Sequence, residues 1–448
     1  MKTNRISPRN RREFLKSCCG LGAAGISAHL TRLGMVSAQA QTSSSYKALI
    51  CVFFFGGNDS NNMIVPIDSR YASYQSMRGA VALGQGAVLP AGSSGFGLHP
   101  SMTNVQRLYG QNRAAAVFNV GTLFRPTTKA SLASTQLPRN LYSHSDQTQQ
   151  WQSSDPNGGG TGWGGRVTDR VIVQNPGTLP PGISLQGGNA LFLSGQDTKG
   201  LNYSNGTSFG LSRFGNSTAM DARLAGMQRV LTFDSGVQMI GSANGVLSDS
   251  IRSGQEINTA LSSAPVLPVT FPGTGLGQQL AQVARIISVR GALGMNRQIF
   301  FAGMGGFDNH ENLLGNHANL MATVDGAFGA FMSAMESMGT LNDVTLFTES
   351  EFNRTGDANA NVGTDHAWGG HHIVLGGAVR GGATYGTFPT LQLRGPDDAG
   401  SRGNFIPTTS LDQYAATMGG WFGVPDAELR LIFPNLANFT PQRLTFMG

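Results

Sequence analysis

Imidazole and carboxylate side chains that can bind a metal ion gather in the last third of this 448-residue chain. Five of its eight histidines lie within 63 residues, at His310, His317, His366, His371 and His372. Asp308, Glu351 and Asp365 stand among them, and Asp59 lies far upstream. Nitrogen and oxygen donors of these types bind divalent cations such as zinc, calcium or magnesium. Because no short motif such as HExxH occurs, separate elements would have to bring the donors together.

Each candidate ligand also has a purely structural interpretation. Asp59 follows Gly-Gly-Asn, where an aspartate commonly closes a turn through its side chain. His310 and His317 are seven residues apart, which is about 10 Å along a helix. They can therefore share an ion only if His310 precedes the helix, and His317 is equally well explained as a hydrogen-bonded core histidine. Strand alternation directs only one of His371 and His372 inward. His366, in a glycine-rich segment without apolar neighbours at core spacing, is the strongest functional candidate.

A candidate nucleophile lies in the segment 142–146, which reads YSHSD. Residues 147–152 contain no helix breaker, so the segment is predicted to start a helix. A hydroxyl there, on Ser143 or less favourably Ser145 and with His144 beside it, would lie at the positive end of the helix. That position stabilises an alkoxide and receives an anionic ester. Taken locally, a plain N-cap formed by Ser143 is the simpler interpretation, since serine is a preferred residue there.

Five short apolar runs are predicted to form buried strands, at 47–55, 114–120, 299–304, 344–347 and 373–375. Amphipathic stretches separate them, including 280–289 and 314–338, where apolar residues recur at spacings of three and four. Buried strands alternating with helices indicate an α/β fold with a mostly parallel sheet between helices. Ligands of such sheets collect beyond the carboxyl ends of the strands, where Asp59, Asp308 and Glu351 are expected.

The mature chain is expected to be one domain, residues 41–448, with a loop-rich insertion or cap at about 123–272. This region is rich in glycine, serine and asparagine and contains two helical patches, at 218–231 and 247–261. Hydrophobic residues make up 40% of the chain, which is enough for a folded core and excludes a disordered protein. Cys51 is the one cysteine after residue 40, so no disulfide can form within the mature chain.

Charge separates the first 40 residues from the rest. The chain has 31 basic and 25 acidic residues, a net charge of +6, and residues 1–40 account for all of it with seven bases and one acid. The remaining body is neutral, which argues against a nucleic-acid partner and against a polybasic membrane surface.

The first 40 residues read as an export signal. They run from NRREFLK at 10–16 through an apolar stretch at 18–35 to Ala-Gln-Ala at 38–40. The paired arginines followed by Phe-Leu-Lys look like a twin-arginine signal, which implies the twin-arginine translocase as partner and a periplasmic or extracellular location. No later stretch is long and apolar enough to span a bilayer, so the mature chain is expected to be soluble.

Several motifs follow one another in an order that points to a known family. They are Gly56–Asp59, Ser143–Trp151, Thr161–Arg166, Gly306–His310, Ser350–Thr355, Gly363–His366 and Gly376–Gly382. With the leader, this order resembles a secreted bacterial family called domain of unknown function 1501, itself similar to the alkaline phosphatase and sulfatase superfamily. Gly363–His366 also resembles the G-T-D-H element of phosphopentomutases, whose histidine is a metal ligand.

The resemblance implies an alkaline-phosphatase-like fold and a role for each candidate residue. Ser143 would be the nucleophile, with His144 beside it. The implied metal ligands are Asp59, Asp308, His310, His317, Glu351, Asp365 and His366. Glu351 stands where the superfamily usually has an Asp-His pair, so one usual ligand is missing or replaced. One or two divalent ions would then activate the hydroxyl and support displacement at phosphorus or sulfur.

These features predict an exported metal-dependent hydrolase of phosphate or sulfate esters, acting on a small-molecule or polymer substrate. The replaced Asp-His pair and the Gly/Ser/Asn-rich insertions favour an alternative, in which a non-catalytic binding or surface-assembly protein keeps the fold and a structural metal. A third possibility is hydrolysis through Ser143 and a nearby base, without a defined ester preference.

Overall fold

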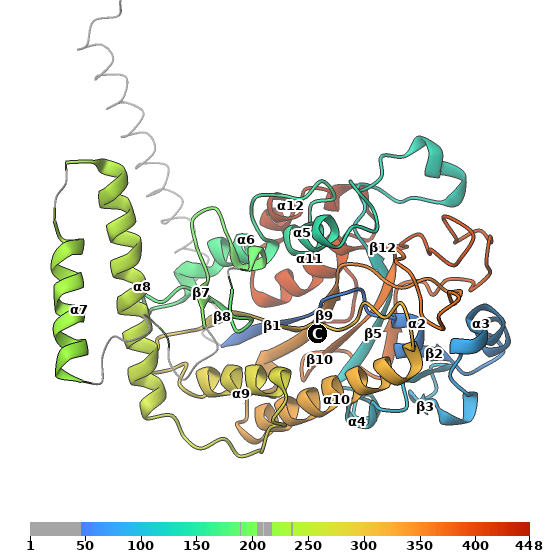
Figure 1. Ribbon diagram of the computed structural model, residues 1–448, viewed down its shortest axis with the longest axis horizontal. Coiled ribbons are helices and arrows are strands. Elements are labelled where there is room, and N and C mark those ends of the chain that lie inside the picture. Colours follow the sequence, from blue (N-terminus) through green and yellow to red (C-terminus); the bar gives the residue numbers. More distant parts are fainter. Residues whose placement is uncertain (1–45, 189, 204–208, 210–216, 234–235) are drawn as a thin grey trace, which may run out of the picture. The chain divides into compact units, whose positions relative to one another are not determined.

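The predicted apolar runs form the centre of one mixed sheet (Figure 1). The computed structural model describes residues 46–188, 190–203, 209, 217–233 and 236–448, and the predicted export signal at 1–40 lies outside them. The five predicted strands are β1 (Lys47–Phe54), β5 (Ala114–Gly121), β8 (Arg297–Met304), β9 (Val344–Ser350) and β10 (Gly370–Gly376). Shorter strands extend the sheet: β6 (Gly182–Ser184), β7 (Leu201–Asn202), β11 (Ala383–Tyr385) and β12 (Thr409–Ser410).

The strand order is β11-β5-β10-β9-β1-β8-β6-β7, and β12 pairs with β5. All of these pairings are parallel except those of β10, which is antiparallel to both β5 and β9. The expected α/β fold with a mostly parallel sheet is therefore confirmed. A separate three-stranded sheet consists of β2 (Ile64–Pro66), β4 (Phe96–Leu98) and β3 (Leu89–Pro90).

Helices cover both faces of the large sheet, because alternate residues of its central strand enter two different apolar cores. Ile50 and Val52 pack in the core beneath α4 (Thr103–Gly110), α9 (Gly275–Ser288) and α10 (Leu313–Ser337). Leu49 and Cys51 pack in the other core. That face is covered by α5 (His144–Ser153), α6 (Trp163–Val171), α11 (Leu411–Phe422) and α12 (Asp426–Ile432). Burial on both faces explains why the strands read as continuous apolar runs rather than alternating ones.

The same double coverage corrects the prediction for two histidines of β10. Both His371 and His372 are buried, whereas strand alternation directed only one of them inward. The His371 ring lies against Phe118 in one layer, and the His372 ring lies against Trp151 in the other. Neither face of the sheet is open to solvent at this point. Alternation along the strand therefore does not separate buried side chains from exposed ones.

The region 123–272 contributes to the body of the fold as well as to its periphery. Its α5 and α6 cover the sheet and its β6 pairs with β8. Further along, α7 (Thr218–Leu231) and α8 (Gln238–Ser262) pack on each other, and α8 packs on α9.

Two short helices, α2 (Ser60–Met63) and α3 (Tyr71–Arg78), follow β1. Short 3-10 helices occur at Gly79–Val81, Gln85–Ala87, Lys129–Ser134, Ile172–Gln174, Leu191–Leu193, Leu341–Asp343 and Leu436–Asn438. Among the helices of the described residues, none combines the length and apolar composition needed to cross a bilayer.

Asp325 joins two helices of the same layer. Helix α4 has no side-chain cap of its own, and the Asp325 carboxylate of α10 replaces one by accepting hydrogen bonds from Asn104 N (3.1 Å) and Val105 N (2.9 Å). The negative charge also lies at the positive end of the α4 dipole. The carboxylate is buried, so its loss would leave two amide groups without acceptors.

We expect Asp325→Ala to lower the free energy of unfolding by about 2 kcal/mol, the usual effect of losing hydrogen bonds to a buried charge. The measurement is the urea unfolding midpoint. Glu336→Ala is the control on the same helix, because its ion pair with Arg113 is exposed and contributes about 0–1 kcal/mol. Equal effects of the two substitutions would contradict the assigned role of Asp325.

Candidate metal centre

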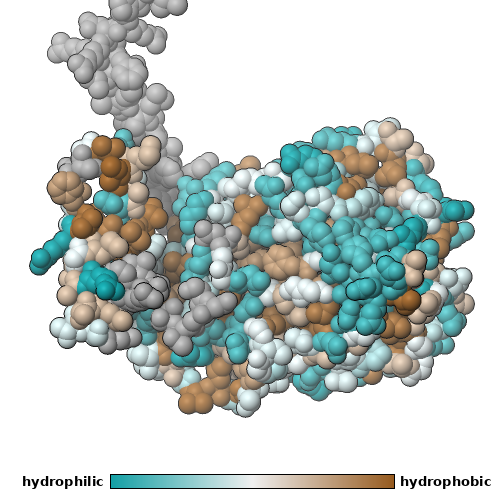
Figure 2. Space-filling model, in the orientation of Figure 1, coloured by the Kyte–Doolittle hydropathy of each residue, from teal (hydrophilic) through white to brown (hydrophobic). Residues whose placement is uncertain are grey.

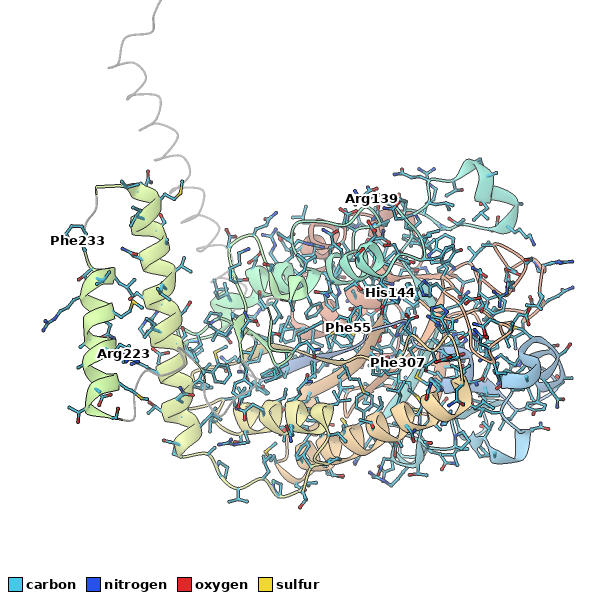
Figure 3. The ribbon with its side chains drawn as sticks, in the orientation of Figure 1. Phe55, Arg139, His144, Arg223, Phe233 and Phe307 are labelled. Carbon is cyan, nitrogen blue, oxygen red and sulfur yellow. The ribbon has the colours of Figure 1, made fainter. Side chains whose placement is uncertain are left out.

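Ends of five elements meet at one edge of the sheet. Asp308 and His310 follow β8, and Glu351 follows β9. His366 precedes β10, whose antiparallel direction places its start at the edge where β8 and β9 finish. The chain that leaves β5 at this edge leads to His144, the first residue of α5 (Figure 3). Topology therefore brings together residues from positions 144 to 366.

Three imidazoles surround the carboxylate of Asp308. His310 Nε2 lies 2.9 Å and His366 Nε2 3.2 Å from Asp308 Oδ1, and His144 Nε2 lies 3.4 Å from Oδ2. The Nε2 atoms of His310 and His366 are 3.2 Å apart. Ligand atoms of His144, Asp308 and His366 all lie within 4.8 Å of one another. The four side chains keep 21–44% of their surface exposed, so solvent or a ligand can reach the cluster.

The Nδ1 atom of His366 faces the backbone carbonyl of Tyr142 at 2.8 Å. A carbonyl oxygen only accepts hydrogen bonds, so Nδ1 carries the proton and Nε2 presents a lone pair to the cluster. Tyr142 adopts a positive φ of 73°, which is costly for a residue with a large side chain. The strained residue directly precedes the N-cap of α5, and its carbonyl fixes the tautomer of His366.

The other two imidazoles are held in the same way by carboxylates. His144 Nδ1 lies 2.9 Å from Glu351 Oε1, and His310 Nδ1 lies 3.0 Å from Asp365 Oδ1. An ionised carboxylate only accepts, so each Nδ1–H donates, and each Nε2, which is directed at Asp308, has a lone pair for a cation when it carries no proton. Carboxylate-held histidines of this kind are typical of metal sites, where the second hydrogen bond fixes the ring and raises its basicity.

Charges and burial around the cluster shift the pKa values of its members in different directions. Fully buried Arg354 donates from Nη1 to Asp308 Oδ1 at 2.7 Å. Burial alone would raise the pKa of Asp308, but the hydrogen bond and charge of Arg354, with the charges of His310 and His144, outweigh it and lower the pKa. Burial lowers the pKa of His366, which favours its neutral form. The hydrogen bond with Glu351 raises the pKa of His144.

Asp365 is held by a similar balance. Burial would raise its pKa, but hydrogen bonds from Arg402, Asn359 and His310 lower it to about 2. Its Oδ2 accepts from Arg402 Nη1, and Oδ1 lies 3.2 Å from Asn359 Nδ2. The carboxylate is therefore ionised at neutral pH and serves as the partner of His310 rather than pointing its oxygens at Asp308.

Two glycines allow the strand ends to approach this closely. Gly56 adopts φ +115°, and a Cβ on it would lie 2.5 Å from the backbone nitrogen of Asp308. A Cβ on Gly363 would lie 2.0 Å from the carbonyl carbon of His310. Any side chain at either position would push a cluster residue out of place, which explains the glycines of the Gly-Gly-Asn-Asp and Gly-Thr-Asp-His segments.

Asp59 and His317, two of the predicted ligands, lie away from the cluster. Asp59 is buried, pairs with buried Arg78 at 2.5 Å, and caps α2 by accepting from Asn62 N at 3.1 Å. His317 lies on the buried face of α10, 3.0 Å from Asn58 Oδ1 through Nε2. Helix α10 begins at Leu313, so His310 precedes it and the stated condition for sharing an ion with His317 is met. His317 nevertheless contacts Asn58, and His310 contacts Asp308.

The candidate nucleophile Ser143 is the N-cap of α5. Its hydroxyl donates to Asp146 Oδ2 at 2.7 Å and accepts from Asp146 N at 3.4 Å. Hydrogen bonds from Ser143, Arg139 and Asn140 lower the pKa of Asp146 to about 2, which makes this carboxylate a weak base. In the described part of the chain, no hydrogen bond joins the Ser143 hydroxyl to the histidine cluster.

Three contributors were missed by sequence reasoning. Arg354 lies in the quoted Ser350–Thr355 motif, where its charge could have suggested a partner for Asp308. Arg402 lies outside every motif, and the Tyr142 carbonyl has no sequence signal, because a backbone atom of a left-handed tyrosine cannot be recognised from residue type.

The sequence profile of the family described as "Protein of unknown function (DUF1501)" matches residues 46–410. No curated protein sequence matches the chain. Among solved structures, the PsFucS1 sulfatase from Pseudoalteromonas sp. is 11% identical, over 86% of this chain and 74% of that one, with a TM-score of 0.33. The zinc complex of the C-terminal periplasmic domain of EcEptC from Escherichia coli is 10% identical, over 86% and 84%, with a TM-score of 0.35. At these identities the likeness concerns the fold alone.

We expect Asp59→Asn to lower stability without releasing bound metal. Removing one charge of a fully buried ion pair leaves Arg78 uncompensated, which typically costs about 3–5 kcal/mol. Urea unfolding measures the loss, and elemental analysis of the folded variant measures bound metal. Asp68→Asn is the control, since its pair with Arg70 is exposed. A folded Asp59→Asn protein that has lost its metal would restore Asp59 as a ligand.

Proposed function

The chain belongs to the DUF1501 family, and from this premise we propose that it is an exported, divalent-metal-dependent hydrolase of phosphate or sulfate esters. One observation carries the proposal. The Nε2 atoms of His144, His310 and His366 all point at the Asp308 carboxylate, while their Nδ1 atoms are committed to other acceptors. In their neutral forms these rings direct Nε2 lone pairs toward Asp308, where a divalent cation can take the place of the protons that they would otherwise donate.

The donor set fits one ion of the zinc type. Three imidazole nitrogens and one carboxylate oxygen suit zinc, whereas calcium and magnesium favour sites made of oxygen atoms. Tetrahedral zinc–nitrogen bonds of about 2.0–2.1 Å separate ligand nitrogens by roughly 3.3 Å. The Nε2 atoms of His310 and His366 are 3.2 Å apart. In this proposal Glu351 and Asp365 orient the histidine ligands through hydrogen bonds and do not bind the ion themselves.

A divalent ion held there would act as a Lewis acid on an ester oxygen and lower the pKa of a bound hydroxyl or water. The chain's own residues supply the rest. The start of α5, where His144 is the first helical residue, offers backbone N–H groups without helical acceptors and the positive end of the dipole to an anionic ester. Ser143, adjacent to His144, supplies the hydroxyl, and Arg354 offsets the charge of Asp308.

A second candidate function is favoured by the contacts of Ser143. Its hydroxyl is engaged by Asp146 and caps the helix, which is a complete structural role without catalysis. In that case the protein would be a non-catalytic exported binding or assembly module with a structural metal. Both candidates include export directed by residues 1–40 through the twin-arginine translocase, to the periplasm or beyond.

We expect the purified protein to contain one tightly bound divalent ion and His366→Gln to lose it. The loss follows because an amide cannot replace the Nε2 lone pair at the same position. Elemental analysis after gel filtration measures metal per chain. The matched control is His317→Gln, the same change at a histidine that lies in the core and contacts Asn58. Metal retention in His366→Gln, or loss from both variants, would contradict the proposed centre.

We expect turnover of aryl phosphate or sulfate esters that falls at least about 1,000-fold in Ser143→Gly, with metal content unchanged. Glycine is chosen because it is tolerated at an N-cap, so the helix loses only a few tenths of a kcal/mol. Ser145→Gly is the control at the neighbouring hydroxyl. Bound metal without turnover on a broad ester panel would instead support the second candidate.

A further inference from the structure

The α7–α8 hairpin carries an apolar surface that the described chain does not cover. No residue of α7 is buried, and the buried residues of α8 all lie in its second half, from Ile251 onward. In the first half of α8, from Gln238 to Ser250, every residue is exposed or half-buried. Isolated helices of this size gain most of their stability from packing an apolar face, so the hairpin lacks part of the packing such elements normally have.

Exposed apolar side chains concentrate on this hairpin. Six of the twelve exposed large apolar residues among the described residues lie within positions 230–246. Five that carry the argument are Val230, Phe233, Met239, Ile240 and Val246, with exposed fractions from 46% to 81%. Apolar surface gathers at the end of the hairpin near the α7–α8 turn (Figure 2), and Phe233 at this turn points away from the helices (Figure 3).

Spacing places three of these residues, Val230, Met239 and Val246, on one flank, and Phe233 and Ile240 lie at the turn beside it. Met239, Ala243 and Val246 recur at intervals of four and three along α8. Each of them lies one position before a residue of α8 that faces α7. On α7, Gly226 and Val230 likewise precede the α8-facing Met227 and Leu231 by one residue.

Helices α7 and α8 run in opposite directions. In such a pair, residues that lie one position before the contact line of each helix fall on the same side of the hairpin. The α8 line continues along the helix to Ser253 and Ile257, which are buried. The exposed flank is therefore a core-type stripe that extends past the described body of the protein.

Gly226 supports close approach of something from outside the chain. A Cβ on Gly226 would meet nothing within 4 Å, so packing among the described residues does not require glycine there. A glycine inside a helix makes that helix less stable than an alanine would. The contacts of the described residues therefore give no reason for glycine at position 226. A second helix crossing closely at this flank supplies one.

We propose that this flank is a dimerisation surface, on which the hairpin of a second copy of the chain packs to form a four-helix arrangement. The five exposed side chains of the flank and the adjoining turn together offer roughly 600 Å² per copy, so two copies would bury up to about 1,200 Å², the lower limit of a stable interface. An apolar flank can meet its own copy across a two-fold axis without pairing like charges.

Charge argues against a lipid surface as the occupant. Residues 217–262 contain three arginines, four acidic residues and no lysine, a net charge of −1. Hairpins that bind anionic bilayers surround their apolar side chains with lysine and arginine, and this one does not. A second copy of the chain is the occupant that fits both the apolar flank and the charge.

The test is sedimentation velocity on the purified, metal-containing protein and two variants of α8. We expect the parent protein to sediment as a dimer and Val246→Glu to weaken association at least tenfold. Ser248→Glu is the matched control, because Ser248 is exposed on the opposite side of the same helix and should leave the dimer intact. Circular dichroism checks that both variants keep their helix content.

Three outcomes would overturn the proposal. They are a parent protein that stays monomeric up to about 100 µM, a dimer equally weakened by both variants, and a dimer weakened by neither. A monomer that floats with phosphatidylcholine–phosphatidylglycerol vesicles would assign the flank to lipid instead. Ester turnover and bound metal are measured in parallel. The dimer proposal does not depend on the result of either measurement.

Discussion

The arrangement at the sheet edge depends on the direction of three imidazole lone pairs. His144, His310 and His366 each donate a proton from Nδ1 to a fixed acceptor, which leaves the three Nε2 atoms facing one carboxylate. The Nε2 atoms of His310 and His366 are 3.2 Å apart, so at most one of them can hold a proton between the two rings, whereas a shared cation binds both lone pairs. The surrounding groups act on this one constraint. Arg354 balances Asp308, Arg402 balances Asp365, and a strained Tyr142 turns its carbonyl toward His366.

The topology explains how such distant residues meet. β1, β8 and β9 are parallel and end at the same edge, so the segments after them share a location. β10 runs the other way, and so the histidine on its side of the cluster precedes the strand instead of following it. Glycine at positions 56 and 363 removes the Cβ atoms that would hold these segments apart. The edge is thus built from chain direction and backbone proximity as much as from the side chains themselves.

Sequence reasoning predicted the fold closely because burial on both faces leaves a strong signal. All five apolar runs are strands, and the 3,4 spacing after Gly306 is α10. The family assignment from ordered motifs is confirmed by the match over residues 46–410. The cap interpretation of Ser143 also matches the structure, since N-capping depends on neighbours within three residues. The set of metal ligands was harder to predict from the sequence. Asp59, Glu351 and Asp365 have the right chemistry for metal binding, yet their oxygens are directed at Arg78, His144 and His310.

The sequence by itself determined the strands, the main helices, the family and the pool of residues from which a metal centre could be made. These properties follow from residue type and short spacing, which the chain carries locally. Only the tertiary structure decided which of those residues meet, which ring nitrogen carries the proton, and that His310 rather than His317 faces Asp308. These choices depend on which segments, up to about 220 positions apart in the sequence, lie close together, and on which hydrogen-bond partner each polar atom then finds.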